Sequence, residues 1–344
     1  MISFPVISLA TTHFLITSQQ FELVALSLLI ALVIALAFTP LTMKLAVYAG
    51  VMDRPQARRV HTKPTPRWGG LAMFSAFVLT VFALAPIRHY VLHEPIGTIL
   101  NRQVIGVLIG GVIMTTIGAL DDKYNVPAKL KLLGQICAAI VLVLPIFGVR
   151  FMVAFNVDLN HYFWLGSFLT VLWVVAVTNT INLIDGLDGL AAGISGIAAL
   201  TFVIISVAIK GTFGEALLAA AVLGACLGFL RYNFHPAKVF MGDAGSHFLG
   251  FTIAALSILQ NWKVATGVAF AVPMLILAVP IFDTAFAIIR RLRRGQPIFS
   301  PDKGHLHHRL LGLGLGQRSV VLTIYALTAI GCALALLLTR TAPW

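Results

Sequence analysis

The 344-residue sequence has little charge: only 10% of its residues are Asp, Glu, Lys or Arg, against about 25% in soluble proteins. Hydrophobic residues make up 59% of the chain. This balance excludes an ordinary soluble domain. Cysteine is scarce as well, and the three cysteines lie apart inside apolar runs with no pairing pattern, which indicates packing residues (Cys137, Cys226 and Cys332).

Basic residues are absent before Lys44, so the N-terminus lacks the basic region of a signal peptide. Residues 1–16 are apolar but short and contain His13, and we expect them to lie at the outer surface rather than to span a membrane. The weak alternation typical of a membrane barrel is also missing.

Long apolar runs dominate the chain instead, and they predict an all-α polytopic membrane protein with about ten transmembrane helices. No charged linker or low-complexity tail marks a second domain, so residues 1–344 are expected to form a single one. The runs lie near 21–42, 68–86, 102–120, 131–148, 163–180, 189–209, 214–231, 246–260, 264–289 and 318–339. The ninth run contains Pro273 and Pro280 and is expected to be kinked.

Basic residues are distributed unequally between the two ends of these spans. Eighteen of the 24 Lys and Arg residues fall in segments that reach one side, which the positive-inside rule makes cytoplasmic. Both termini are then external. Eight Asp residues fall at or near the same cytoplasmic side, whereas all three Glu residues lie near the outer face. Short carboxylates among many cations suggest a site for a metal ion and a polyanion.

A polar stretch, Asn179–Leu190, interrupts the apolar runs and places Asn179, Asn182, Asp185 and Asp188 at i, i+3 spacing. An Asp at the centre of a membrane helix costs about 2.5–3.5 kcal/mol, so we expect this stretch to face water or a ligand. Hydrogen bonds that bridge helices are the alternative.

Two further motifs bring carboxylates to the same side. Asp121 and Asp122 end the third span and are followed by Lys129 and Lys131; acids there oppose the helix dipole, which favours a functional role over solvated helix-end acids. A Gly-Asp-x-Gly-Ser turn presents Asp243 before the eighth span. That turn is compatible with a simple helix cap, or with an oxygen ligand for Mg²⁺.

Basic and histidine-rich segments complete the set. The loop 54–70 is interpreted equally well as a positive-inside loop or as a phosphate clamp, with Arg58, Arg59, His61, Lys63 and Arg67 as its candidate ligands. His305, His307, His308 and Arg309 lie together; the cations beside them favour a pyrophosphate over zinc. Asp283, inside the ninth span, is either functional or part of a structural ion pair.

These motifs, in this order, resemble the polyprenyl-phosphate N-acetylhexosamine-1-phosphate transferase family, of the glycosyltransferase 4 type. The resemblance runs from about residue 44 to residue 310. It is greater to the undecaprenyl-phosphate GlcNAc-1-phosphate transferase branch, because the segments that begin at His61 and Pro301 match that branch's patterns. The phospho-MurNAc-pentapeptide translocase branch has three consecutive His residues, whereas Leu306 interrupts them here.

The resemblance implies that a polyprenyl phosphate attacks the β-phosphorus of a UDP-amino sugar and that UMP leaves. It implies Mg²⁺, with Mn²⁺ as an alternative, held by Asp243 and Asp121. Asp122 would deprotonate or align the lipid phosphate. By the same resemblance the other residues line the substrates: Asp185, Asp188, His305, His307 and His308 as catalytic groups, and Arg58, His61, Lys63, Arg67, Lys129, Asn182 and Arg309 as binding groups.

The expected partners are the UDP-sugar, the polyprenyl phosphate and the bilayer of the plasma (inner) membrane, with the active site facing the cytoplasm. We expect no nucleic-acid partner, and a homodimer stays open. Two alternative functions also stay open. One is a transferase for a different UDP-acetamido sugar, such as MurNAc-pentapeptide; the other is an ion-coupled transporter, although the chain shows no obvious repeat and its acids do not lie at a midplane.

Overall fold

Helices account for nearly all of the regular structure in the computed structural model of the chain. The model describes residues 17–341 apart from 54–63, 94–99, 152, 155–156, 160, 211, 261–267 and 296–303. The helices are α1 (Ser18–Tyr48), α2 (Gly69–Leu92), α3 (Arg102–Tyr124), α4 (Ala128–Val143), α5 (Phe163–Ile184), α6 (Leu190–Ile204) with a π-helical extension (Ile205–Lys210), α7 (Phe213–Asn233), α8 (Gly242–Leu259), α9 (Val268–Ile276), α10 (Ala278–Arg293), α11 (Leu306–Gly312) and α12 (Gln317–Thr341).

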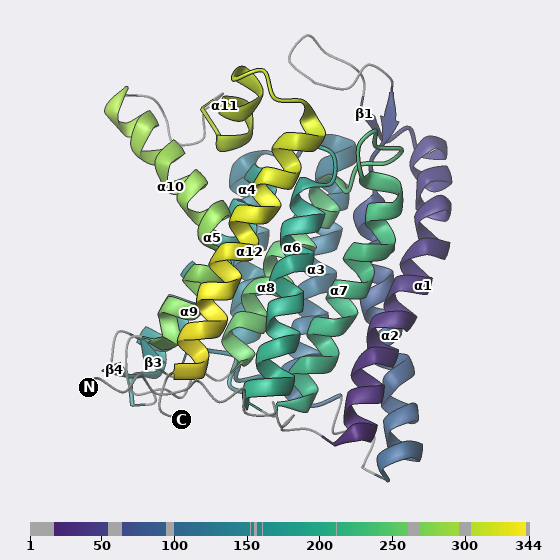
Figure 1. Ribbon diagram of the computed structural model, residues 1–344, viewed down its shortest axis with the longest axis vertical. Helices are drawn as coiled ribbons and strands as arrows, with labels where there is room; N and C mark the ends of the chain where they lie inside the picture. The colour runs from purple at the N-terminus through teal and green to yellow at the C-terminus, as the bar shows by residue number, and fades with distance from the viewer. Residues whose placement is uncertain are drawn as a thin grey trace, which may run out of the picture.

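Most of these helices run along the long axis of the molecule as one bundle (Figure 1). Seven of them, α1, α2, α3, α5, α6 with its extension, α7 and α12, are long and apolar enough to cross a membrane. The fold is therefore that of an all-α membrane protein. Shorter helices, namely α4, α8 and the pair α9–α10, occupy the positions of the three other expected spans, so the number ten stays a prediction.

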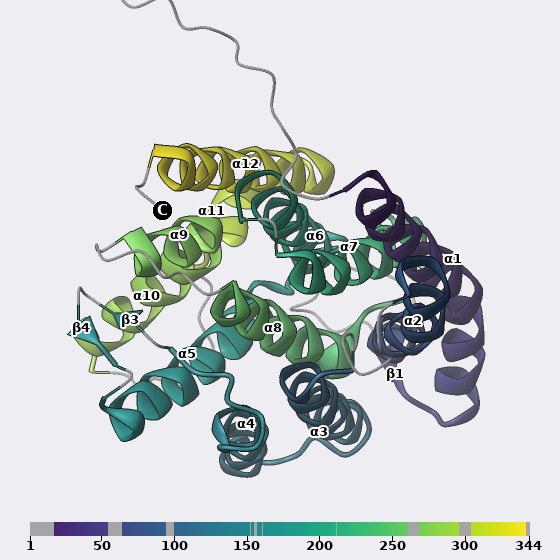
Figure 2. The same ribbon diagram turned by 90° about the horizontal axis from the view of Figure 1, so that it is seen from below.

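Helix α8 forms the centre of the bundle. Figure 2 shows it enclosed by the other helices, and every residue from Ala244 to Leu259 is buried. It packs against α3 and α5, whereas α1 packs against α7 and α2. Glycines allow the closest of these contacts: a Cβ atom on Gly224 or Gly228 of α7 would collide with the backbone of α1. This pair of small residues thus lets the two helices pack at backbone distance.

Proline breaks the ninth expected span, as predicted. Helix α9 contains Pro273 and ends at Ile276, and α10 begins at Ala278 after a break at Leu277. Pro280 lies in the first turn of α10, where the backbone N–H groups have no intrahelical partner, so its missing N–H costs nothing.

Short antiparallel strand pairs form outside the helices. β1 (Met52–Asp53) pairs with β2 (Thr65–Pro66), and β3 (Val153–Ala154) pairs with β4 (Val157–Asp158). The second pair lies between α4 and α5. The start of α1 and the end of α12 lie at one end of the bundle, whereas β1 and α11 lie at the other (Figure 1).

Candidate active site

A polar cavity opens at the end of the bundle that carries β1 and α11. It encloses about 1030 Å³ of empty space that is open to solvent, and segments far apart in the sequence contribute to it. Its lining residues are mostly polar: Asp53, Arg67, Asn182, Asp185, Gly186, Leu187, Asp188, Asn233, Phe240, Gly242, Asp243, His308 and Gln317. The fold therefore brings most of the polar sequence motifs together around one cavity, at the end of the bundle with the most basic residues.

Two carboxylates beside this cavity share one ammonium group. Asp121, in the last turn of α3, and Asp243, in the first turn of α8, lie 2.9 and 3.4 Å from Nζ of Lys131 on α4. A single Lys cannot neutralise two carboxylates, so the pair keeps excess negative charge. Hard oxygen ligands with this excess charge suit a divalent cation such as Mg²⁺.

Asp122 has a different environment from its neighbour. Its side chain is 0% exposed, and its two oxygens accept hydrogen bonds from the backbone N–H groups of Asp243 (2.9 Å) and Ala244 (3.2 Å). The carboxylate that is unfavourable at the C-terminus of α3 is thus favourable at the N-terminus of α8. Each oxygen thus accepts one backbone N–H in a fully buried position, and the role of Asp122 with the lipid phosphate stays a prediction.

Gly242 makes this arrangement possible. Its φ is +67°, and a Cβ atom there would overlap the carboxylate of Asp122. Only glycine combines that backbone conformation with such a close approach.

Asn182, Asp185 and Asp188 line the cavity as well. Asn182 donates hydrogen bonds to Asp243 (3.1 Å) and to Ser246 (2.8 Å). Helix α5 ends at Ile184, so Asp185 and Asp188 project from a loop and not from a continuous helical stripe. Burial, together with the charges of Asp243 and Asp122, raises the pKa of Asp185 to about 8. Ionisation of Asp185 beside these two carboxylates is therefore unfavourable unless a cation binds nearby.

The remaining polar residue of that stretch bridges helices. Asn179 donates to the side chain of Gln135 on α4 at 2.7 Å and lies outside the cavity lining. For this one residue the alternative of a hydrogen bond between helices is correct.

Arg67 is the cation of the basic loop that the structure places at the cavity. One of its nitrogens lies 3.3 Å from Asp53 and another lies 3.8 Å from Asp122. Arg58, Arg59, His61 and Lys63 lie outside the described residues. Lys129 is exposed at the start of α4, and Lys131, two residues later, makes the contacts with the carboxylates.

The histidine run divides into separate environments. His305 pairs with Asp283 at 2.9 Å, which supports the structural ion pair for that intramembrane acid. His307 is buried, and this burial lowers its pKa to about 4, so its imidazole is neutral at pH 7. His308 lines the cavity, whereas Arg309 is exposed. A role in binding pyrophosphate suits His308 best of the three.

Sequence reasoning missed several residues of the site. Ser246, Asp53 and His235 contact the predicted residues, and Phe240 and Gln317 line the cavity. Of the two lysines that follow Asp122, the sequence assigned a binding role to Lys129, whereas Lys131 makes the contacts. Asp53 is one of the eight Asp residues near the cytoplasmic side, but no motif gave it a role, and nothing local marked His235.

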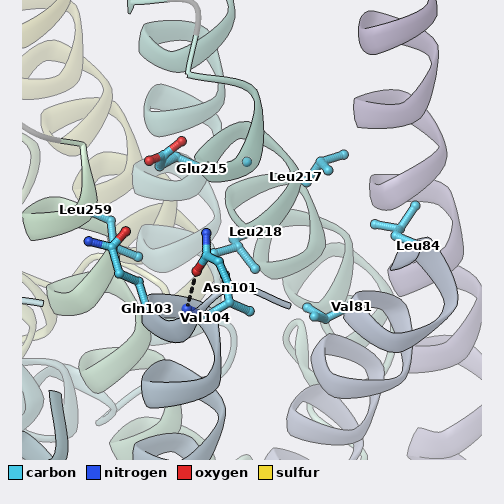
Figure 3. A pocket seen from close by; sticks show the side chains of 10 residues that line it. Val81, Leu84, Asn101, Gln103, Val104, Glu215, Leu217, Leu218 and Leu259 are labelled. Atoms are coloured by element: carbon cyan, nitrogen blue, oxygen red, sulfur yellow. Dashed lines mark hydrogen bonds between the residues drawn. The ribbon is translucent and has the colours of Figure 1, made fainter. Parts of the chain in front are cut away.

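A second cavity lies beside the first turns of α3 and α7, away from the polar cavity, and Figure 3 shows its lining side chains. It has about 460 Å³ of empty space and a mostly aliphatic lining that includes Leu84, Leu217 and Leu259. Asn101, another lining residue, caps α3 through the N–H of Val104. Its one acid, Glu215, would repel phosphate, so we assign the chemistry to the polar cavity.

Comparisons with known proteins point to one family. The model of glycosyl transferase family 4 matches residues 104–261. The chain is 42% identical to a probable undecaprenyl-phosphate N-acetylglucosaminyl 1-phosphate transferase of Bacillus subtilis, covering 93% of this chain and 86% of that protein. It is 37% identical to a decaprenyl-phosphate N-acetylglucosaminephosphotransferase of Mycobacterium tuberculosis, covering 88% and 79%. It is 28% identical to an undecaprenyl-phosphate alpha-N-acetylglucosaminyl 1-phosphate transferase of Escherichia coli, covering 86% and 78%.

Proposed function

This chain belongs to glycosyl transferase family 4, and we propose that it transfers N-acetylglucosamine 1-phosphate to a polyprenyl phosphate in the membrane. The relatives' names describe this transfer to undecaprenyl or decaprenyl phosphate, and the similarity covers most of both chains. Within the structure, one observation carries the assignment: Asp121 and Asp243 share the ammonium of Lys131 beside an open polar cavity.

The donor is UDP-N-acetylglucosamine. An oxygen of the polyprenyl phosphate forms a bond to the β-phosphorus of the donor, the bond from that phosphorus to the bridging oxygen breaks, and UMP leaves with that oxygen. The product is a lipid-linked pyrophosphoryl sugar, on which cell-envelope polysaccharide synthesis would start. No water or redox partner takes part.

Phosphoryl transfer between anions depends on charge neutralisation and alignment more than on covalent help from the protein. Asp243 and Asp121 are the residues that would hold Mg²⁺, or alternatively Mn²⁺. Among the residues that the structure describes, no group of three His, Cys, Asp or Glu side chains could hold a metal ion by itself. Mg²⁺ does not need such a group, because it binds through one or two carboxylates together with substrate phosphates and waters. When bound, the cation supplies positive charge to the phosphate oxygens.

The chain's own residues align the reacting groups. Lys131 holds the two carboxylates side by side, and Asn182 fixes one oxygen of Asp243. Asp122 anchors the start of α8, and with it the backbone of Asp243, through two hydrogen bonds. Arg67 presents a fixed positive charge at the cavity for a phosphate group.

The membrane context supports this assignment. Since the lipid acceptor is confined to the bilayer, the enzyme that uses it must lie there, and the seven apolar helices meet that need. The excess of basic residues at this end supports a cytoplasmic position for the cavity in this proposal, at the plasma membrane and on the side where nucleotide sugars are made. We retain ten spans in this proposal, with α4, α8 and the pair α9–α10 completing the set.

A substrate screen tests the proposal. Purified protein in detergent, with Mg²⁺ and polyprenyl phosphate, is incubated with UDP-GlcNAc, UDP-GalNAc or UDP-MurNAc-pentapeptide, and UMP and the lipid product are measured. UDP-GlcNAc is expected to give both products, whereas omission of the lipid is expected to give neither. Turnover of another sugar with none of UDP-GlcNAc would refute the assigned donor.

A further inference from the structure

The loop between α7 and α8 holds one carboxylate of the cavity wall in place. Asp188 accepts two hydrogen bonds on the same oxygen, Oδ2: one from Nδ1 of His235 at 2.8 Å and one from the backbone N–H of Ala237 at 3.1 Å. Because the carboxylate only accepts, Nδ1 is the protonated nitrogen of His235. The side chain of Asp188 is 13% exposed, and part of it lines the cavity.

Helix α12 in turn fixes this loop. Two nitrogens of Arg318, Nε and Nη2, donate to the backbone carbonyl of His235 at 3.1 and 3.0 Å. Such a paired contact restrains both the position and the orientation of the carbonyl, because the guanidinium group is planar. Gln317, the preceding residue, lines the cavity. Arg318 lies beyond the residues that the family model matches, 104–261.

A second set of contacts joins the same three segments. The side chain of Asn233 accepts from the N–H of Gly189 at 3.0 Å and donates to the carbonyl of Val239 at 2.8 Å. The hydroxyl of Tyr325, on α12, donates to the carbonyl of Gly189. The loop that contains Asp188 is thus held by the α7–α8 loop on one side and by α12 on the other.

This arrangement leaves one oxygen of Asp188 for a ligand. Both hydrogen bonds go to Oδ2, and within the described part of the chain no residue donates to Oδ1. A carboxylate oxygen repels phosphate but accepts from a hydroxyl or an N–H group. A carboxylate already held in its binding orientation also avoids the cost of ordering when the ligand arrives.

We propose that His235 and Arg318 are positioning residues that hold Asp188 to accept a hydrogen bond from an uncharged part of the nucleotide-sugar donor. This inference rests on the proposed function for the identity of the donor. Asp188 contacts the α7–α8 loop, whereas Asp121 and Asp243 contact Lys131. Loss of the network therefore weakens donor binding and leaves the chemical step nearly unchanged.

Four variants test it: His235→Ala, His235→Asn, His235→Gln and Arg318→Ala. The amide nitrogen of Asn reaches the place of Nδ1, whereas that of Gln reaches the place of Nε2. We expect His235→Ala and His235→Gln to raise the KM for UDP-GlcNAc about tenfold, as for loss of a hydrogen bond to a charged acceptor, with kcat within about twofold. His235→Asn is expected to stay within about threefold of wild type, and Arg318→Ala to raise KM about threefold.

The matched control is His161→Ala, which removes an exposed imidazole from the segment between β4 and α5 and is expected to change neither constant. A loss of kcat at unchanged KM, or an Asn variant as weak as the Gln variant, would overturn the positioning role. Calorimetric binding of UDP-GlcNAc in the absence of the lipid acceptor gives the same ranking without turnover. If the wild type binds UDP-GlcNAc but transfers no GlcNAc phosphate, the proposed function fails while the ranking still decides the positioning role; absence of UDP-GlcNAc binding overturns both.

Discussion

Replacing Asp122 by alanine separates the structural work of this carboxylate from the chemistry beside it. The side chain is fully buried and accepts the backbone N–H groups of Asp243 and Ala244. Each hydrogen bond to a charged acceptor contributes about 1.5–3 kcal/mol, so Asp122→Ala should lower the free energy of unfolding by about 3–6 kcal/mol. Asp122→Asn keeps one acceptor oxygen and should lose about half of that amount.

Asp121→Ala is the matched comparison, since it removes the adjacent carboxylate. The side chain of Asp121 is 12% exposed, against 0% for Asp122, and it pairs with Lys131, which is itself 27% exposed and keeps Asp243 as a second partner, so the loss of stability should be smaller, about 1 kcal/mol. UMP release should fall more than a hundredfold in both variants. Unfolding is measured by circular dichroism during titration of the detergent-solubilised protein with sodium dodecyl sulfate. Equal stability of Asp122→Ala and wild type would refute the anchoring role of Asp122.

Three further predictions follow from the same geometry. Gly242→Ala forces a Cβ atom into the Asp122 carboxylate and should abolish UMP release. Its control is Gly50→Ala, which is also at positive φ but has open space around it; this variant should lose only about 1 kcal/mol of stability and keep its activity. Lys131→Met leaves two carboxylates without their shared cation and should lower kcat at least about a hundredfold. The kcat of the control Lys123→Met, at an exposed position, should stay within about twofold of wild type. Equal effects of the two substitutions on kcat would exclude the role of Lys131 as a shared cation. His307 has a pKa of about 4 in the folded state, below its value of about 6.5 in the unfolded chain. Its contribution to stability is therefore present above pH 6.5 and disappears as the pH falls toward 4. The unfolding free energy of His307→Gln, measured across that range, should fall less than that of wild type.

The sequence predicted the class of fold and the position of most helices, because apolar runs long enough to span a bilayer are a strong local signal. It also predicted the break in the ninth span, since proline acts within its own helix. It could not settle whether the short segments that form α4 and α8 cross the membrane. Their lengths of 16 and 18 residues lie at the lower limit, and the packing of neighbouring helices decides their place.

The sequence identified the acidic residues of the site but not the different role of each one. Asp121 and Asp122 are adjacent in the chain, yet one meets Lys131 and the other caps α8. That difference depends on where α4 and α8 lie relative to α3, which no local pattern records. The same holds for His235, whose partner Asp188 lies 47 residues earlier in the sequence.

The nucleotide that leaves tests the central claim most directly. Purified wild-type protein is incubated with UDP-GlcNAc, polyprenyl phosphate and Mg²⁺, and the released nucleotide is identified by chromatography. Transfer of the sugar phosphate predicts UMP in equal amount to a lipid pyrophosphate that carries GlcNAc, and none from the Asp243→Asn variant. Release of UDP, which would mean that the sugar moves without its phosphate, would contradict the account, as would UMP release that persists undiminished in Asp243→Asn.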